Sequence, residues 1–249
     1  MKLMKRTWLP LAVLGVGGLV AVAAFAQDLS SRLRDALASP ERSAEFKARD
    51  ANTKPAEVLD FLGVEEGMTV LDVVSGGGYW TSVLSPAVGP SGTVYMQNPA
   101  FFVNREGFLD QERAIVERLG NVKPVHGDLA EAGIDGQVDV AITSNNFHDM
   151  YNRGGDEGGV AFLAGIFKAL KPGGVLGLID HEGLPGGNNA ELHRVDAGSA
   201  KRVLEAAGFV VEEESDLLDN PDDPKTVGVR DPSVAGKTDK ILIRARKPE

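Results

Sequence analysis

The chain contains no cysteine, which excludes disulfide bonds and leaves its stability to a packed core. It is also poor in positive charge, because 26 lysine and arginine residues stand against 36 aspartate and glutamate residues. An acidic protein is repelled by the phosphates of nucleic acids and of anionic lipid headgroups, so we expect neither as a partner. Internal repeats and low-complexity tracts are absent as well, and no pattern in the sequence indicates an oligomeric state.

Residues 1–26 have the organisation of a secretory signal peptide. Three basic residues among the first six precede an uncharged apolar run at residues 8–25, and Ala24-Phe25-Ala26 has the small-residue pattern of a cleavage site. We expect cleavage after Ala26 and export to the periplasm of a bacterium, without stable membrane association afterwards. An uncleaved membrane anchor is the alternative, because the apolar run approaches the length of about 20 residues that spans a bilayer. A lipoprotein is excluded, since no cysteine lies at the junction.

Cleavage leaves about 220 residues, with 23 basic against 36 acidic side chains, which suits one α/β domain. Residues 27–53 have a helical composition and are expected to form an extension that covers or flanks the domain at residues 54–249. Within the domain, helical patterns alternate with short β-branched runs, which predicts a doubly wound α/β fold with a mostly parallel sheet. The predicted strands lie at residues 70–74, 93–98, 122–126, 137–143, 175–180, 209–215 and 240–246.

The segment TVLDVVSGGGYWT, residues 69–81, combines a buried strand, a glycine turn and the beginning of a helix. Gly76, Gly77 and Gly78 let the backbone turn sharply and let a ligand lie close to it, because no Cβ stands in the way. Proline at position 86 is expected to end the following helix early. This unit predicts a nucleotide-like ligand, and a glycine turn without a ligand is the alternative.

Asp72 indicates which class of ligand the glycine turn binds. It lies near the end of the strand, where its charge would repel a pyrophosphate, since phosphate favours helix N-termini and uncharged turns. A carboxylate instead suits a ligand with a cationic group, such as the amino group of S-adenosylmethionine (SAM). A nicotinamide-dependent oxidoreductase is disfavoured by Asp72 and by Thr81, which stands where that fingerprint requires a third glycine.

The spacing V-L-D-x-x-x-G-G-G resembles motif I of the class I SAM-dependent methyltransferases, with Val74 where the family has a glycine. The turn L-K-P-G-G-x-L at residues 170–176 is a second similarity, and the chain is similar to exported predicted methyltransferases over residues 54–248. The resemblance implies a seven-stranded Rossmann-like sheet with a reversed last strand. It also implies SAM as the cofactor, held by Asp72, Ser75, Gly76, Gly77, Gly78, Asn98 and Asp128.

Two of these residues follow later strands. Asn98 stands where the family has an acidic residue that binds the ribose hydroxyls. An amide there makes weaker hydrogen bonds than a carboxylate, with a loss of binding free energy on the order of 1 kcal/mol. Asp128 stands where the family recognises the adenine amino group. Apart from the resemblance, both positions are ordinary turns.

Polar residues crowd after the predicted strand at 137–143, where residues 144–151 are SNNFHDMY. In open α/β sheets this carboxyl edge binds ligands. The catalytic candidates are Asn145, His148, Asp149 and Tyr151, with His148 as a general base assisted by Asp149. A solvated loop histidine is the alternative, and a glycine-rich loop at residues 154–159 is expected to follow.

A metal site is a further alternative at this edge. Asn145 and Asp149, together with Asp180-His181-Glu182 after the fifth strand, resemble the ligands of catechol-type methyltransferases. Their spacing does not require a metal, so no metal is predicted. The sequence therefore predicts a SAM-dependent methyltransferase with a small-molecule acceptor. An exported, non-catalytic binding protein on the same fold is the alternative, because a fold alone does not determine activity.

Overall fold

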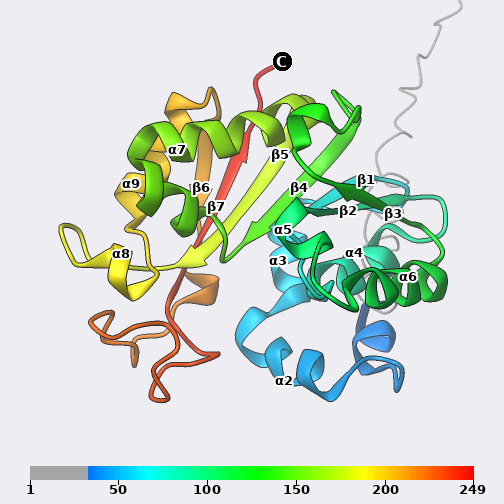
Figure 1. Cartoon of the computed structure of the whole chain (residues 1–249), viewed down its shortest axis with the longest axis horizontal. Coiled ribbons are helices and arrows are strands. Elements are labelled where there is room, and N and C mark those ends of the chain that lie inside the picture. The colour runs from blue at the N-terminus through cyan, green and yellow to red at the C-terminus, as the bar shows by residue number, and fades with distance from the viewer. Residues whose placement is uncertain (1–32) are drawn as a thin grey trace, which may run out of the picture.

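The computed structural model describes residues 33–249, so the predicted signal peptide lies outside the described residues. A seven-stranded sheet crosses the domain with helices on both faces (Figure 1). The strands are β1 Thr69–Val73, β2 Thr93–Asn98, β3 Val122–His126, β4 Val138–Ser144, β5 Leu170–His181, β6 Val210–Glu214 and β7 Lys240–Arg246. Their order is β3-β2-β1-β4-β5-β7-β6, and β7 runs antiparallel to both its neighbours. The predicted mostly parallel sheet with a reversed last strand is confirmed.

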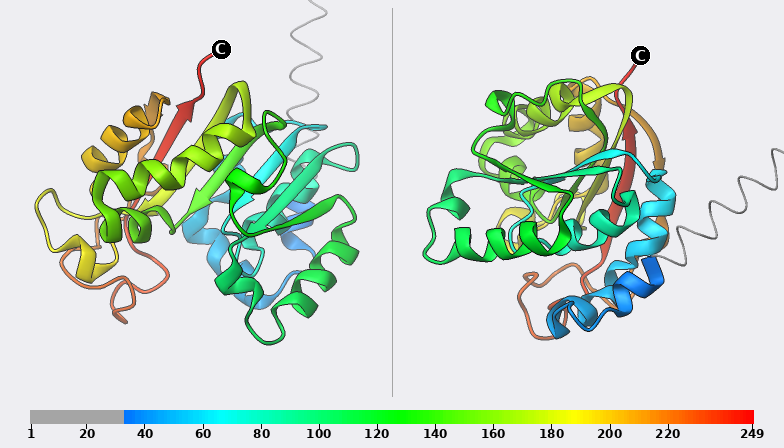
Figure 2. Two further views of the ribbon diagram at one scale, coloured as in Figure 1. Left: turned by 45° about the horizontal axis from the view of Figure 1, so that its top comes forward. Right: turned by 90° about the vertical axis from the view of Figure 1, so that its right-hand side faces the viewer.

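Two hydrophobic cores fill the space between the sheet and its helices. The helices are α2 Ala44–Thr53, α3 Pro55–Leu62, α4 Tyr79–Val88, α5 Ala100–Val103, α6 Phe108–Leu119, α7 Phe147–Ala169, α8 Asn189–Leu192 and α9 Ala197–Ala206, and a further short helix spans 33–38. α3, α4 and α6 pack on one face of the sheet, and α7 and α9 pack on the other (Figure 2). β1 is buried on both faces, as expected for a central parallel strand. In residues 33–249 no helix combines the length and apolarity needed to cross a bilayer.

Tertiary packing overrides two predictions about helices. α4 continues to Val88 although Pro86 lies inside it, because Ala87 and Val88 are fully buried in the core and outweigh the missing hydrogen bond. The expected glycine-rich loop at 154–159 is part of α7, which has one non-helical residue at Gly155. Gly159 is needed for close packing, since a Cβ there would lie 2.7 Å from Val203 Cγ1 of α9.

Smaller differences concern where elements begin and end. Helix α6 begins at Phe108, after Gly107 in a left-handed conformation. The L-K-P-G-G turn belongs to β5 as a bulge, because Leu170 pairs with Val138 and Val175 pairs with Val140. The described part of the N-terminal extension contains two helices, 33–38 and α2.

Candidate functional site

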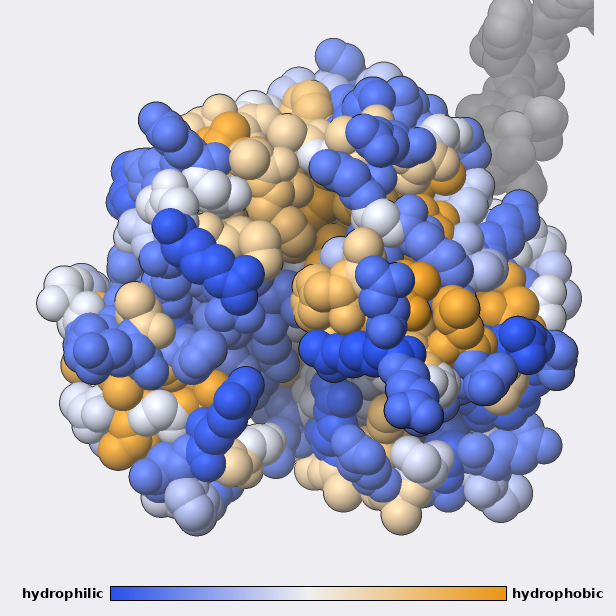
Figure 3. Space-filling model, in the orientation of Figure 1, coloured by the Kyte–Doolittle hydropathy of each residue, from blue (hydrophilic) through white to orange (hydrophobic). Residues whose placement is uncertain are grey.

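A cavity of about 320 Å³ opens at the carboxyl ends of β1 and β4. This is the point where the strand order reverses, at which open α/β sheets bind ligands. Figure 3 shows the surface hollowed between the half of the molecule that carries α7 and α8 and the half that carries α2 and α6. The cavity is lined by Glu45, Phe46, Arg49, Asp72, Val73, Val74, Ser75, Gly77, Tyr79, Trp80, Gln111, Ser144 and Asn146. The N-terminal extension therefore covers the site through α2.

Asp72 is the buried acid of this cavity, with 2% of its surface exposed. Its Oδ2 accepts hydrogen bonds from Thr81 N and from Thr81 Oγ1, both at 2.7 Å. Burial raises the pKa of Asp72 to about 7, although the Thr81 bonds and the positive charge of Arg49 lower it. A cation bound in the cavity would remove part of this penalty and favour the ionised form.

Packing between aromatic side chains holds α2 in place over the glycine turn. The Tyr79 ring meets the rings of Phe46 and Trp80 edge to face, each with centroids 5.5 Å apart. Its hydroxyl donates to Asp50 Oδ1 at 2.8 Å, and the Arg49 guanidinium lies 4.0 Å from the ring centroid. Trp80 Nε1 is buried without a hydrogen-bond partner among the described residues. The cavity wall thus offers a cation, the Arg49 guanidinium, beside an aromatic cluster.

The predicted cofactor residues divide into those that line the cavity and those that do not. Asp72, Ser75 and Gly77 line it. Gly76 and Gly78 turn the chain beneath it with positive φ angles of 55° and 79°, which glycine adopts readily. Asp128 is exposed outside the lining, and its Oδ1 accepts from Ala130 N at 2.9 Å.

Asn98 is fully buried and supports the turn. Its Oδ1 accepts from Gly76 N at 2.9 Å, and its Nδ2 donates to Ser75 Oγ at 2.8 Å. Gln97, which no sequence pattern pointed to, accepts from Val74 N at 2.9 Å. The end of β2 therefore holds the glycine turn in place, and the role of Asn98 on the ribose stays a prediction.

Val74 occupies the position where the family motif has a glycine. Its φ is 54°, in the left-handed region where a β-branched residue is strained. The backbone has kept the glycine conformation, and only the side chain has changed.

His148 lies in the first turn of α7 and is 4% exposed, so it is not a loop histidine. Its Nδ1 lies 2.7 Å from Asp180 Oδ1, and its backbone N donates to Asp180 Oδ2 at 2.8 Å. Asp149, the predicted assistant, is 3.7 Å from Nε2. Burial lowers the pKa of His148, but the bond to Asp180 and the charges of both carboxylates outweigh it and raise the pKa. Asp180, not Asp149, orients the imidazole.

The other two catalytic candidates have different surroundings. Tyr151 donates to Ser199 Oγ at 3.1 Å and accepts from Arg202 Nη2 at 3.1 Å, so it joins α7 to α9. Its catalytic role stays a prediction. Asn145 has a left-handed backbone with φ 58°, and its buried Oδ1 has no partner among residues 33–249.

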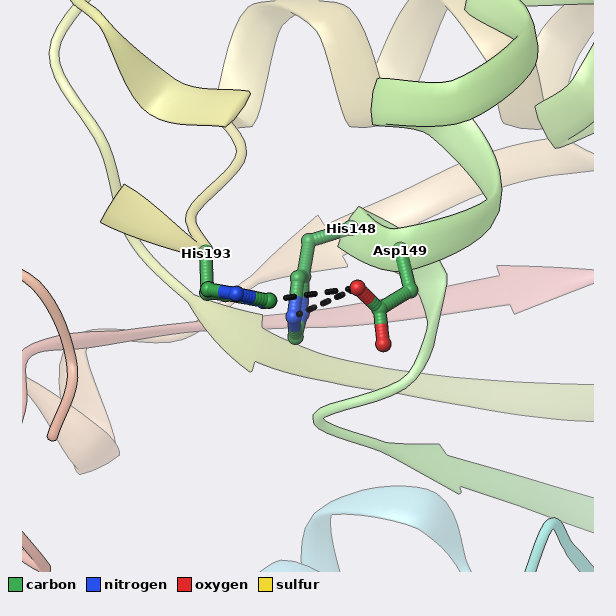
Figure 4. A group of neighbouring side chains, drawn as sticks. All are labelled: His148, Asp149 and His193. Carbon is green, nitrogen blue, oxygen red and sulfur yellow. Dashed lines mark ion pairs between the residues drawn. The ribbon is translucent and has the colours of Figure 1, made fainter. Parts of the chain in front are cut away.

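The metal ligands considered from the sequence do not assemble. His181 Nδ1 lies 2.6 Å from Thr238 Oγ1, and Glu182 pairs with Lys225 at 2.5 Å. A different histidine approaches instead, because His193 Nδ1 lies 3.4 Å from Asp149 Oδ1 (Figure 4). No local pattern marked His193, since it follows α8, far along the chain.

Comparison with known proteins agrees with the observed fold. The crystal structure of a SAM-dependent methyltransferase from Aquifex aeolicus superposes with a TM-score of 0.59 and 23% identity, over 89% of this chain and 97% of that one. The fold is that of the class I methyltransferases.

A second protein with the methyltransferase fold is the Burkholderia thailandensis 1,6-didemethyltoxoflavin-N1-methyltransferase with bound 1,6-didemethyltoxoflavin and S-adenosylhomocysteine. It has a TM-score of 0.55 and 18% identity, over 98% of this chain and 94% of that one. The family model of protein-L-isoaspartate(D-aspartate) O-methyltransferase matches residues 48–112. The demethylmenaquinone methyltransferase of Staphylococcus aureus is 31% identical over 123 residues, 48% of this chain and 45% of its own length. The chain thus spans about half the length of the curated relatives that it matches.

Proposed function

We propose that the protein is a SAM-dependent methyltransferase that acts on a small-molecule acceptor. One observation carries the proposal: the Asp72 carboxyl group and the Arg49 guanidinium line the same cavity at the switch point of a methyltransferase fold. These opposite charges match the amino and carboxylate groups at the amino-acid end of SAM.

The residues of the cavity fit this cofactor. A Cβ on Gly77 would meet no atom within 4 Å, so there is open space beside the turn. The cavity volume of about 320 Å³ is within the range of small-molecule sites. When bound, SAM supplies a methyl group on a positively charged sulfur, which a nucleophilic acceptor atom can take.

The acceptor is expected between the cavity and the first turn of α7. Ser144 and Asn146 line the cavity at the end of β4, and α7 begins immediately after them. Positioning two reactants in this way supplies most of the rate in a transfer that needs little further chemistry. Where the acceptor must lose a proton, His148 Nε2 is the candidate to take it, because Asp180 holds the other ring nitrogen.

Two of the matched proteins are named for small-molecule acceptors, which supports an acceptor of that size here. The family model named for a protein substrate matches residues 48–112, which contain β1, the glycine turn and β2 and stop short of α7. A binding protein without activity is the second candidate. The strained Val74 and the uncharged Asn98, both departures from the family motif, favour it.

Calorimetric titration with SAM tests the cofactor. The wild type should bind, and Arg49→Gln should bind about tenfold more weakly, a loss of about 1.4 kcal/mol. Arg113→Gln is the matched control, because Arg113 is exposed on α6 and pairs with Asp110. Absence of SAM binding at millimolar concentration would refute the proposal and leave the binding-protein reading, and binding of NADH instead would indicate an oxidoreductase.

We further propose that the protein is exported and that its mature form begins at Gln27. The basic start, the apolar run and Ala24-Phe25-Ala26 support this. Intact mass of the protein isolated from its native host measures the cleavage, and a full-length chain in the membrane fraction would contradict it. Since SAM is made in the cytoplasm, an exported enzyme needs a supply of cofactor outside.

A further inference from the structure

We propose that His148, Asp149 and His193 form a binding site for a divalent transition-metal ion. Figure 4 shows the three side chains directed toward one another, two from the first turn of α7 and one from the segment after α8. Each offers one ligand atom, and these atoms lie within 4.8 Å of one another. In the part of the chain that the structure describes, this is the one group of histidine and acidic side chains with such an arrangement.

The distances suit a shared ion better than direct contact. Asp149 Oδ1 lies 3.7 Å from His148 Nε2 and 3.4 Å from His193 Nδ1. Both exceed the 2.7–3.2 Å of an N–H···O hydrogen bond. Two ligand atoms that each lie about 2.1 Å from one ion at a tetrahedral angle are about 3.4 Å apart. Asp149 Oδ1 is therefore spaced from each imidazole nitrogen as two ligands of one ion are, and all three donor atoms lie within 4.8 Å of one another.

Asp180 orients the His148 ring and determines which of its nitrogens is free to bind a metal ion. Its Oδ1 lies 2.7 Å from His148 Nδ1, and Asp180 is fully buried. A buried carboxylate keeps the proton on Nδ1, which leaves the lone pair of Nε2 directed at Asp149 and His193. Metal-bound histidines commonly have such a carboxylate on their second ring nitrogen, where it orients the ring and increases its basicity.

His193 is presented by a firmly anchored segment. The next residue, Arg194, is fully buried, and its guanidinium donates to both oxygens of Asp223 at 2.8 and 3.0 Å and to the carbonyl of Glu182 at 2.7 Å. His193 itself is held in a left-handed conformation with φ 55°, which is strained for a residue with a Cβ. The structure thus holds the ligand in position instead of leaving it on a mobile loop.

The ligand set indicates the class of metal. Two imidazoles and one carboxylate suit Zn²⁺, Fe²⁺, Co²⁺ or Ni²⁺, whereas Mg²⁺ and Ca²⁺ prefer sites made of oxygen ligands. The side chains of Asp149 and His193 are 37% and 44% exposed, so the ion keeps positions open to solvent. Three protein ligands with an open position are typical of sites that bind a further oxygen or nitrogen donor. Without an ion, Arg153 is the cation nearest to Asp149, at 3.9 Å, and it is largely exposed.

The metal site lies outside the proposed SAM-binding residues Asp72 and Arg49, but it uses His148 Nε2. With the ion bound, this nitrogen is a ligand and cannot take a proton from the acceptor. The test uses the untagged full chain after chelator treatment and follows Zn²⁺ by calorimetry and Co²⁺ by its visible absorption. The wild type should bind one ion per chain with micromolar affinity or better, and Mg²⁺ should not compete. His193→Ala and Asp149→Asn should each weaken Zn²⁺ binding at least tenfold, and Asp180→Asn should weaken it tenfold to a hundredfold through His148.

His126→Gln is the matched control. His126 lies on β3 and pairs with Glu112 at 2.8 Å, so its loss should leave Zn²⁺ binding unchanged. SAM binding measured on the same variants shows that they are folded, and its loss with Zn²⁺ binding intact would count against the methyltransferase proposal alone. A wild type that binds neither Zn²⁺, Co²⁺ nor Ni²⁺ at 100-fold molar excess would overturn the metal site. Equal Zn²⁺ affinity in the wild type and in His193→Ala would do so as well.

Discussion

Replacing Asp72 by asparagine should stabilise the protein at neutral pH while weakening its hold on the cofactor. Asp72 is almost completely buried, and that burial raises its pKa from 3.8 to about 7. Asparagine keeps an acceptor oxygen for Thr81 N and Thr81 Oγ1, the two groups that now donate to Asp72. It carries no charge to be removed from water, so the cost of ionisation disappears.

The sign of the pH dependence follows from proton binding. Between pH 4 and pH 7 the folded protein holds a proton on Asp72 that the unfolded chain has released, so the free energy of unfolding falls as the pH rises through this window. A shift of about three pH units corresponds to about 4 kcal/mol at 1.36 kcal/mol per unit. The two proteins should therefore be similar near pH 4, and the variant should be more stable by up to about 4 kcal/mol at pH 8.

Urea denaturation at pH values from 4 to 8 measures both curves, and calorimetry at pH 8 measures SAM binding. The variant should bind SAM at least tenfold more weakly, because a charge-assisted hydrogen bond contributes about 1.5–3 kcal/mol. Thr81→Val is the control, since it keeps the Asp72 carboxyl group but removes the Thr81 Oγ1 bond that lowers the pKa of Asp72. In this variant the free energy of unfolding should continue to fall up to a higher pH than in the wild type. Parallel stability curves for wild type and Asp72→Asn would refute the reasoning.

Substitutions at three further positions test the turn and the segment beside His193. Val74→Gly should raise the free energy of unfolding by about 0.5–1 kcal/mol in urea, because relief of about 1–2 kcal/mol of left-handed strain exceeds the added chain entropy; an unchanged midpoint would show that side-chain contacts of Val74 offset the strain. Asn98→Ala should cost about 1–3 kcal/mol by leaving Gly76 N without an acceptor. Asn98→Asp should restore the acceptor for Gly76 N but should lose stability as the pH rises, because position 98 is fully buried. If its carboxylate reaches the ribose, it should tighten SAM binding a few fold in calorimetry. Asp223→Ala should cost about 3–5 kcal/mol by leaving Arg194 buried and unpaired, and should speed proteolysis within residues 216–239; equal cleavage rates would contradict the anchoring role.

Local patterns were sufficient for the sheet. β2, β3 and β7 have the predicted bounds, because a short β-branched run between turn residues is a local signal for a strand. The glycine turn after β1 was also predicted from a local pattern, the three consecutive glycines that follow a β-branched run. Pro86 and the glycines of α7 led to wrong predictions of a helix end and a loop. Proline and glycine disfavour a helix locally, but the packing of α4 and α7 against the core involves distant residues and outweighs that preference.

The sequence by itself therefore determined the fold class and the place of the glycine turn, which depend on residues close together in the chain, and the reversed last strand was implied by the resemblance to a known family. Only the tertiary structure decided which side chains meet. Asp180 reaches His148 because β5 lies beside β4, and Arg49 reaches Asp72's cavity because α2 folds back over the turn. His193 approaches Asp149 because the buried Arg194–Asp223 pair fixes the segment that carries it. Such contacts between distant residues depend on strand order and packing, which no spacing in the sequence encodes.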